Sequence, residues 1–101
     1  MEKLSLNKQY YLFKNLSDLF SAGFTIKESL QFLSQVGGRQ STIKKIANKL
    51  SEGSSFSDSI VGLVHNDFYN QIMISEKYGD LSSCLAELSH FIEVKLKNKS
   101  K

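Results

Sequence analysis

Glu87 and His90 have the spacing at which two side chains of one helix can bind a metal ion. In carboxylate-bridged metal sites, a Glu-x-x-His pair projects from a helix into the centre of a bundle. Here both residues fall roughly opposite the apolar stripe of their own segment. That stripe consists of Leu81, Leu85, Leu88 and Ile92. The pair also has no second copy, so it favours a solvated helix face over a metal site, and we expect no metal and no cofactor.

Cys84 is the only cysteine of the chain. It cannot form an intramolecular disulfide, and no histidine shares its apolar face, so we expect a small buried packing residue rather than a nucleophile. His65 and His90 lie far apart, in no spacing typical of a catalytic triad. The glycines lack the succession of strand, Gly-rich loop and helix that binds phosphate. These patterns predict a protein that is not an enzyme.

Glu76 is a charged residue in an unexpected position. At 100° per residue, it projects into the middle of an apolar arc. The arc is formed by Phe68, Tyr69, Ile72 and Met73. Gly79 allows a left-handed turn shortly afterwards, and Asp80 can cap the next helix. We therefore expect the Glu76 carboxylate to be a structural clamp that accepts amide hydrogen bonds from a neighbouring turn; the alternative is a contact with a partner or a cation.

Six segments of helical periodicity must position these residues. Proline is absent, and no segment alternates like a strand. Helices are predicted at about 6–22, 25–36 and 41–52, followed by a short helix after Ser54 or Ser55, a fifth capped by Asn66 or Asp67, and a sixth that begins at Asp80 or Ser82. Because the connections are short, the segments predict an all-α fold, a compact antiparallel six-helix bundle.

Local signals define several helix ends and faces. Gly23 and Gly53 are predicted to end the first and third helices. Thr25 and Glu28 have the spacing of a capping box, in which each side chain accepts a hydrogen bond from the backbone of the other. The second helix is expected to bury Ile26, Leu30, Phe32, Leu33 and Val36. The sixth is expected to bury Leu81, Cys84, Leu85, Leu88, Phe91, Ile92 and Leu96.

Ile74 and Tyr78 give the fifth helix a second apolar side, opposite Phe68 and Ile72. One interpretation is that this helix is sandwiched inside the bundle. The other is that Ile74 and Tyr78, together with Glu76, form a candidate partner-binding patch, since exposed apolar clusters tend to mark contact sites.

The charge is concentrated at the C-terminus. The 101 residues suffice for one domain, and a hydrophobic fraction of 41% argues against disorder. Four of the 13 basic residues fall in the last seven positions, namely Lys95, Lys97, Lys99 and Lys101. The preceding residues therefore carry nine basic against ten acidic groups, which disfavours direct nucleic-acid binding. No secretory signal is evident, and no run of about 18 apolar residues could span a bilayer, so the chain as it stands is expected to be soluble.

These lysines divide the sequence into a helical domain at 1–94 and a basic tail at 95–101. Such a tail often serves only to solubilise a terminus. Placed directly after an amphipathic helix, it also resembles a juxtamembrane segment that faces the cytoplasm.

Three segments together resemble a known family. They are LSDLFSAGFTIKESLQFL at 16–33, KLSEGSSFSDSI at 49–60 and ISEKYGDLSSCLAEL at 74–88. In order and spacing they are similar to the F-type domain of type II secretion. That family comprises polytopic inner-membrane platform proteins of type II secretion, type IV pilus and Gram-positive competence pseudopilus machines. The resemblance covers about residues 10–94.

The matching positions lie mostly at turns. They are Ala22, Gly23, Leu30, Gly53, Phe56, Glu76, Gly79 and Leu81. Ser75 stands where the family usually has glycine, and residues 65–67 replace a common proline.

The resemblance implies a six-helix domain that is a non-enzymatic scaffold between an assembly ATPase and pilin-like subunits, with other copies of the platform protein as further partners. Family members carry the domain twice with three membrane spans. The chain therefore resembles an N-terminal domain on the cytoplasmic face of the inner membrane, whose tail lysines would precede the first span. An alternative from another class is a soluble helical regulator that binds a protein partner, or nucleic acid through Lys44, Lys45 and Lys49. The near-neutral body disfavours the nucleic-acid version of this alternative.

Overall fold

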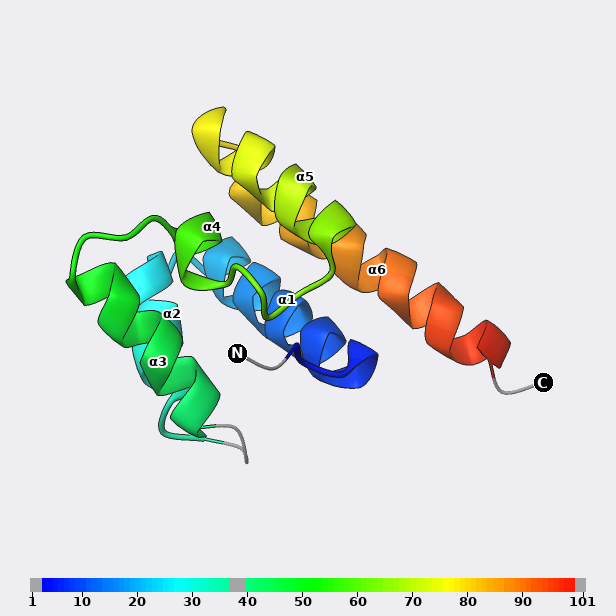
Figure 1. The fold of residues 1–101 in the computed structure, drawn as a ribbon, viewed down its shortest axis with the longest axis horizontal. Helices are drawn as coiled ribbons and strands as arrows, with labels where there is room; N and C mark the ends of the chain where they lie inside the picture. The colour runs from blue at the N-terminus through cyan, green and yellow to red at the C-terminus, as the bar shows by residue number, and fades with distance from the viewer. Residues whose placement is uncertain (1–2, 37–39, 100–101) are drawn as a thin grey trace.

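Six helices joined by short turns form the part of the chain that the computed structural model describes, residues 3–36 and 40–99 (Figure 1). They are α1 (Leu6–Ser21), α2 (Ile26–Leu33), α3 (Gln40–Ser51), α4 (Phe56–Ser59), α5 (Asn66–Lys77) and α6 (Leu81–Lys99). No strand occurs within these residues. The predicted all-α fold of six helices is confirmed.

The long helices α1 and α6 pack side by side in opposite directions and form the spine of the domain (Figure 1). The start of α1 therefore lies toward the end of α6, and the end of α1 lies toward the start of α6. On one side of this spine, α5 folds back along the first half of α6. On the other side, α2 and α3 form a hairpin, and the short α4 connects α3 to α5.

The predicted capping box is present at the start of α2. The amide of Glu28 donates to the hydroxyl of Thr25 at 3.1 Å, and the amide of Thr25 donates to the carboxylate of Glu28 at 2.9 Å. Gly23 and Gly53 follow α1 and α3 with left-handed φ angles of 98° and 103°. Glycine adopts such angles at little cost, so both residues end their helices where the sequence predicts.

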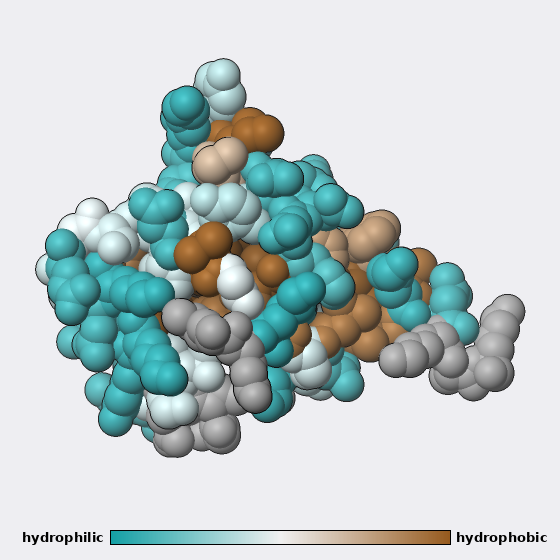
Figure 2. Space-filling model, viewed as in Figure 1, coloured by the Kyte–Doolittle hydropathy of each residue, from teal (hydrophilic) through white to brown (hydrophobic). Residues whose placement is uncertain are grey.

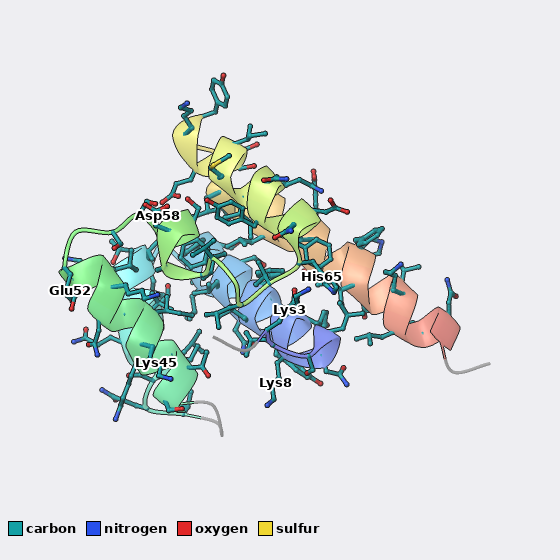
Figure 3. All side chains as sticks on the ribbon, in the orientation of Figure 1. Lys3, Lys8, Lys45, Glu52, Asp58 and His65 are labelled. Atoms are coloured by element: carbon teal, nitrogen blue, oxygen red, sulfur yellow. The ribbon has the colours of Figure 1, made fainter. Side chains whose placement is uncertain are left out.

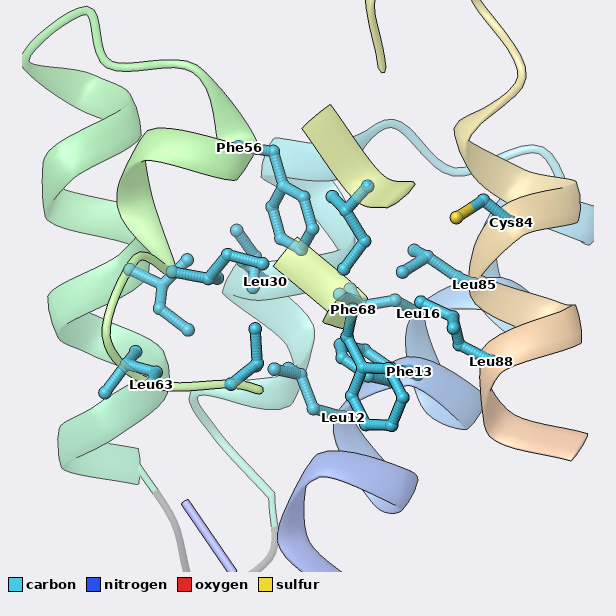
Figure 4. Packing of buried hydrophobic residues seen from close by; sticks show 14 of the residues in the cluster. Leu12, Phe13, Leu16, Leu30, Phe56, Leu63, Phe68, Cys84, Leu85 and Leu88 are labelled. Atoms are coloured by element: carbon cyan, nitrogen blue, oxygen red, sulfur yellow. The ribbon is translucent and has the colours of Figure 1, made fainter. Parts of the chain in front are cut away.

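Buried aromatic and aliphatic side chains from all six helices meet in one core (Figure 4). Phe13 of α1 is fully buried at its centre and packs edge to face on Phe68 of α5, with ring centroids 6.0 Å apart. Phe56, Ile72 and Leu85 bring α4, α5 and α6 into the same cluster. Full burial of such side chains contributes about 1.5–3 kcal/mol each, so this core is the main term that stabilises the fold.

Some predicted faces were wrong. α2 ends at Leu33, and Phe32 and Val36 are 53% and 45% exposed. Each residue turns by about 100° along a helix, so Phe32 points well away from Leu30 and Leu33, which do enter the core. Phe91 lies at the edge of the α6 stripe and is 51% exposed, although its ring still contacts Phe68.

The start of α5 also differs from the prediction. The capping residue is His65 rather than Asn66 or Asp67, and its side chain makes no capping hydrogen bond. At the other end of the fold, α6 continues to Lys99, so the backbone of the basic tail is helical at least that far. Lys101 lies outside the described residues.

Candidate functional site at the α5–α6 corner

The carboxylate of Glu76 binds the start of α4. Its Oε2 atom accepts from the amide of Phe56 at 2.8 Å, and its Oε1 atom accepts from the amide of Ser57 at 3.1 Å. The hydroxyl of Ser55 accepts from the next amide, that of Asp58, at 3.1 Å. The first-turn amides of α4, which have no partners within the helix, are therefore all satisfied by side chains.

This arrangement explains why a charge follows an apolar stripe. α4 has only four residues and is too short to be stable alone. The partial positive charge of its exposed amides favours a carboxylate, and Glu76 supplies one from the last turn of α5. The hydrogen bonds expected of a structural clamp are thus present, and both oxygens of Glu76 are engaged within the domain.

The turn after Glu76 is fixed by backbone hydrogen bonds. The amide of Gly79 donates to the carbonyl of Glu76 at 3.3 Å, and the amide of Asp80 donates to the carbonyl of Ser75 at 2.9 Å. Gly79 has a φ of 77°. This pattern is a Schellman motif, which requires a left-handed residue where Gly79 stands. Leu81 then begins α6 at once, so the corner between α5 and α6 is short and defined.

Apolar side chains are exposed on this corner. Ile74 is 52% exposed and Tyr78 is 79% exposed, with Met73 beside them at 42%. The interpretation that α5 is sandwiched inside the bundle is therefore wrong, because only its Phe68 and Ile72 side is covered. Figure 2 shows hydrophobic surface near the projecting end of α5, next to hydrophilic groups. We call Met73, Ile74 and Tyr78 the corner patch.

The corner patch borders a shallow depression. Its volume is about 390 Å³, and it is lined by Ser55, Met73, Ile74, Glu76 and Lys77. Glu76 reaches this depression while it holds α4, so the patch and the clamp are parts of one surface. Exposed apolar surface of this kind is typical of contact sites, and Lys77 adds a positive charge at its edge.

The residues with candidate metal or thiol chemistry all lie on α6. Glu87 and His90 lie on the exposed side of α6, and the His90 Nδ1 atom is 3.9 Å from Glu93 Oε1. No group of three or more possible metal ligands comes together in residues 3–36 and 40–99. Cys84 is buried, and this burial raises the pKa of its thiol, although a hydrogen bond from Ser75 opposes the shift. A raised pKa keeps the sulfur protonated and unreactive, as expected of a packing residue.

Gln9 is the largest of the buried polar residues, none of which the sequence interpretation identified. Its side-chain amide donates to the carbonyl of Leu4 at 2.8 Å and accepts from the amide of His65 at 3.1 Å. Gln9 thereby satisfies the start of α5 and ties it to the segment before α1. The signal was available, because Gln9 lies three residues before Leu12 on the buried stripe of α1, where a polar side chain needs partners.

Lys95 and Lys97 have partners on their own helix. The Nζ atom of Lys95 lies 5.4 Å from the ring centroid of Phe91, and the Nζ atom of Lys97 lies 3.8 Å from a carboxylate oxygen of Glu93. Within the described ranges, no helix is long and apolar enough to cross a bilayer.

Comparison with known proteins assigns the chain to a family. The model of one family, described as Type II secretion system (T2SS), protein F, matches residues 12–101. No curated protein matches the chain. The family match includes all of α2 to α6 and most of α1, and with them the capping box, the α4 clamp and the α5–α6 corner. The chain therefore belongs to the type II secretion system protein F family.

Proposed function

We propose that this chain is a scaffold domain of an inner-membrane platform protein, placed on the cytoplasmic face, which connects an assembly ATPase to the assembly of pilin-like subunits. Membership of the protein F family supports the general role in a secretion or pilus machine. The finer role rests on one observation, which is the exposed corner patch on a turn that two sets of hydrogen bonds hold in place.

A fixed corner suits a domain that transmits force. Tyr78 exposes most of its surface at the end of α5, while Glu76 and the Schellman turn keep that end from fraying. A partner that binds Tyr78 and Ile74 would therefore displace α5, α4 and the start of α6 together. Tyrosine suits such a contact, since it gives a large apolar area with a polar tip at low entropy cost.

The α1–α6 spine can transmit a displacement of the corner to the C-terminal end of α6. α6 has 19 residues and extends roughly 28 Å at 1.5 Å per residue. It packs along α1 for much of its length, so motion of the corner would move the C-terminal end of α6 as part of a rigid pair. In this proposal the assembly ATPase binds at the corner patch, and the C-terminal end of α6 points toward the membrane. Other copies of the platform protein would pack beside it.

Binding to the cognate assembly ATPase tests the proposal. The experiment compares the wild-type chain, the double variant Ile74→Ser and Tyr78→Ser, and the control Phe32→Ser, by titration calorimetry. Phe32 is as exposed as Ile74 but lies on α2, away from the corner. We expect at least a tenfold weaker association for the corner variant and little change for the control. The proposal is contradicted if the wild-type chain does not bind the ATPase, or if only the control loses affinity.

A further inference from the structure

Charged side chains are distributed unevenly between the two ends of the α1–α6 spine. The end formed by residues 3–8, 40–45 and 93–99 is here called the basic end. Its described charged side chains are Lys3, Lys8, Lys44, Lys45, Glu93, Lys95 and Lys97. The opposite end carries Asp18, Glu28, Glu52, Asp58, Glu76 and Asp80, with Lys27, Lys49 and Lys77. In Figure 3, Lys3 and Lys8 lie near the start of α1, Lys45 lies in the first half of α3, and Glu52 and Asp58 lie at the end of α3 and on α4.

The basic end is hollowed between α1 and α3. A depression of about 380 Å³ lies there, and its polar lining consists of Lys3, Ser5, Lys8, Thr42 and Lys45. The side chains of Lys3, Lys8 and Lys45 are exposed, and none forms an ion pair with a carboxylate among residues 3–36 and 40–99. Three like charges line one depression, so the cluster favours an anion that binds across it.

We propose that the basic end is a docking face for the headgroup layer of an anionic phospholipid bilayer. The proposal rests on the proposed function only in that it needs the domain to work beside a membrane. Its lysines come from α1, α3 and α6 and from the segment before α1, so they match a broad anionic surface better than one small ligand. Lysine is also a point charge without a fixed hydrogen-bonding fork, which suits the mobile phosphates of a lipid layer.

Side chains on α6 favour a bilayer over nucleic acid. Val94 of the basic end is 43% exposed. The Nζ atom of the neighbouring Lys95 lies over the ring of Phe91, which is 51% exposed and shares a depression with Asp67 and Glu87. Apolar and aromatic side chains interleaved with lysine are typical of helices at the boundary between headgroups and acyl chains. The acidic residues of the opposite end would be repelled by the same lipids. The charge distribution therefore orients the domain, with the basic end on the bilayer and the corner patch directed away from it.

Vesicle sedimentation tests this orientation with matched variants. The probes are vesicles of phosphatidylcholine alone and of phosphatidylcholine with phosphatidylglycerol. The test variant is Lys3→Gln, Lys8→Gln and Lys45→Gln together; the control is Lys27→Gln, Lys49→Gln and Lys77→Gln, which removes the same net charge from the other end. Each lysine near an anionic surface strengthens partitioning about fivefold, so the test variant should lose on the order of a hundredfold. The control should lose far less, and circular dichroism verifies that both variants fold.

The other outcomes overturn the proposal. Equal losses in the two variants would mean that net charge alone attracts the domain. Release by inorganic phosphate at constant ionic strength would indicate a small-anion site. If the domain binds duplex DNA through the same three lysines but does not bind the anionic vesicles, the basic end is a nucleic-acid-binding face. If the domain binds vesicles with phosphatidylglycerol no better than vesicles of phosphatidylcholine alone, the basic end is not a lipid-docking face. That result would not affect binding of the ATPase at the corner patch, so the two proposals can fail separately.

Discussion

Glu76 and Phe56 are separated by twenty residues in the sequence, and a hydrogen bond of 2.8 Å joins the carboxylate of one to the backbone amide of the other. With the parallel bond to Ser57, this contact closes the first turn of α4 and fastens it to the last turn of α5. The corner patch on α5 is thereby attached to the core through α4, whose Phe56 is fully buried.

Replacing Glu76 by glutamine should destabilise the domain. A carboxamide has one oxygen, so one amide of α4 would face an NH₂ group instead of an acceptor. Loss of a charge-assisted bond and exposure of an unpaired donor should lower the free energy of unfolding by about 1–3 kcal/mol. Urea unfolding followed by circular dichroism measures this difference. Glu87→Gln on the exposed side of α6 is the control and should stay close to wild type, whereas an unchanged midpoint for Glu76→Gln would reject the clamp.

Gln9 should contribute as much to the free energy of unfolding as a buried apolar residue of similar size. In Gln9→Leu, the carbonyl of Leu4 and the amide of His65 would both lose their partner in a buried place. Each unsatisfied group costs about 1–3 kcal/mol, and the gain in apolar burial only partly offsets this cost. The same change at the exposed Gln31 is the control. Thermal unfolding compares them, and equal effects of the two changes would contradict the assigned hydrogen bonds.

The helices could be predicted from the sequence because their signals are local. Thr25 and Glu28 form the capping box that their spacing indicates, and Gly79 makes the turn that its freedom to adopt positive φ allows. The expectation that Glu76 needs amide partners also followed from its place in the middle of an apolar arc. Its partner could not be named, because the approach of α4 to α5 depends on how the whole core packs.

Exposure was harder to predict than helicity. Phe32 and Phe91 are large and apolar, yet each is about half exposed, since the neighbours of a helix in this small domain do not cover its whole circumference. Ile74 and Tyr78 were open to two interpretations for the same reason. Which side of α5 is covered depends on where α6 lies after the corner, and periodicity within α5 contains no such information.

Ser29→Ala should stabilise the protein. The Ser29 side chain of α2 is fully buried, and its hydroxyl finds no hydrogen-bond partner in the described part of the chain. Alanine removes the cost of a buried unpaired hydroxyl and has a higher helix propensity, so the free energy of unfolding should rise by about 0.5–2 kcal/mol. Ser34→Ala tests the reverse case, because the Ser34 hydroxyl donates to the carbonyl of Gln31 at 2.7 Å. A loss of stability in Ser29→Ala would show that the hydroxyl has a partner.

Cys84 should make stability fall at alkaline pH. Burial raises the pKa of its thiol above the ordinary value of 9.0, and the carboxylates of Glu87 and Asp80 add to this shift. The unfolded chain therefore releases the proton first, near pH 9, while the folded chain still holds it. Because the folded state then binds more protons, the free energy of unfolding decreases as the pH rises from about 9 toward the raised pKa.

The comparison with Cys84→Ala isolates this contribution, since lysine and tyrosine titrations are common to both proteins. The stability difference between wild type and Cys84→Ala should be constant below pH 8 and should shrink above pH 9. Urea unfolding at intervals between pH 7 and pH 10.5 measures it. In the same range, a thiol reagent should modify the folded chain more slowly than the chain in urea. A difference that grows with pH would mean that the folded thiol ionises first, and that Cys84 is a reactive group rather than part of the core.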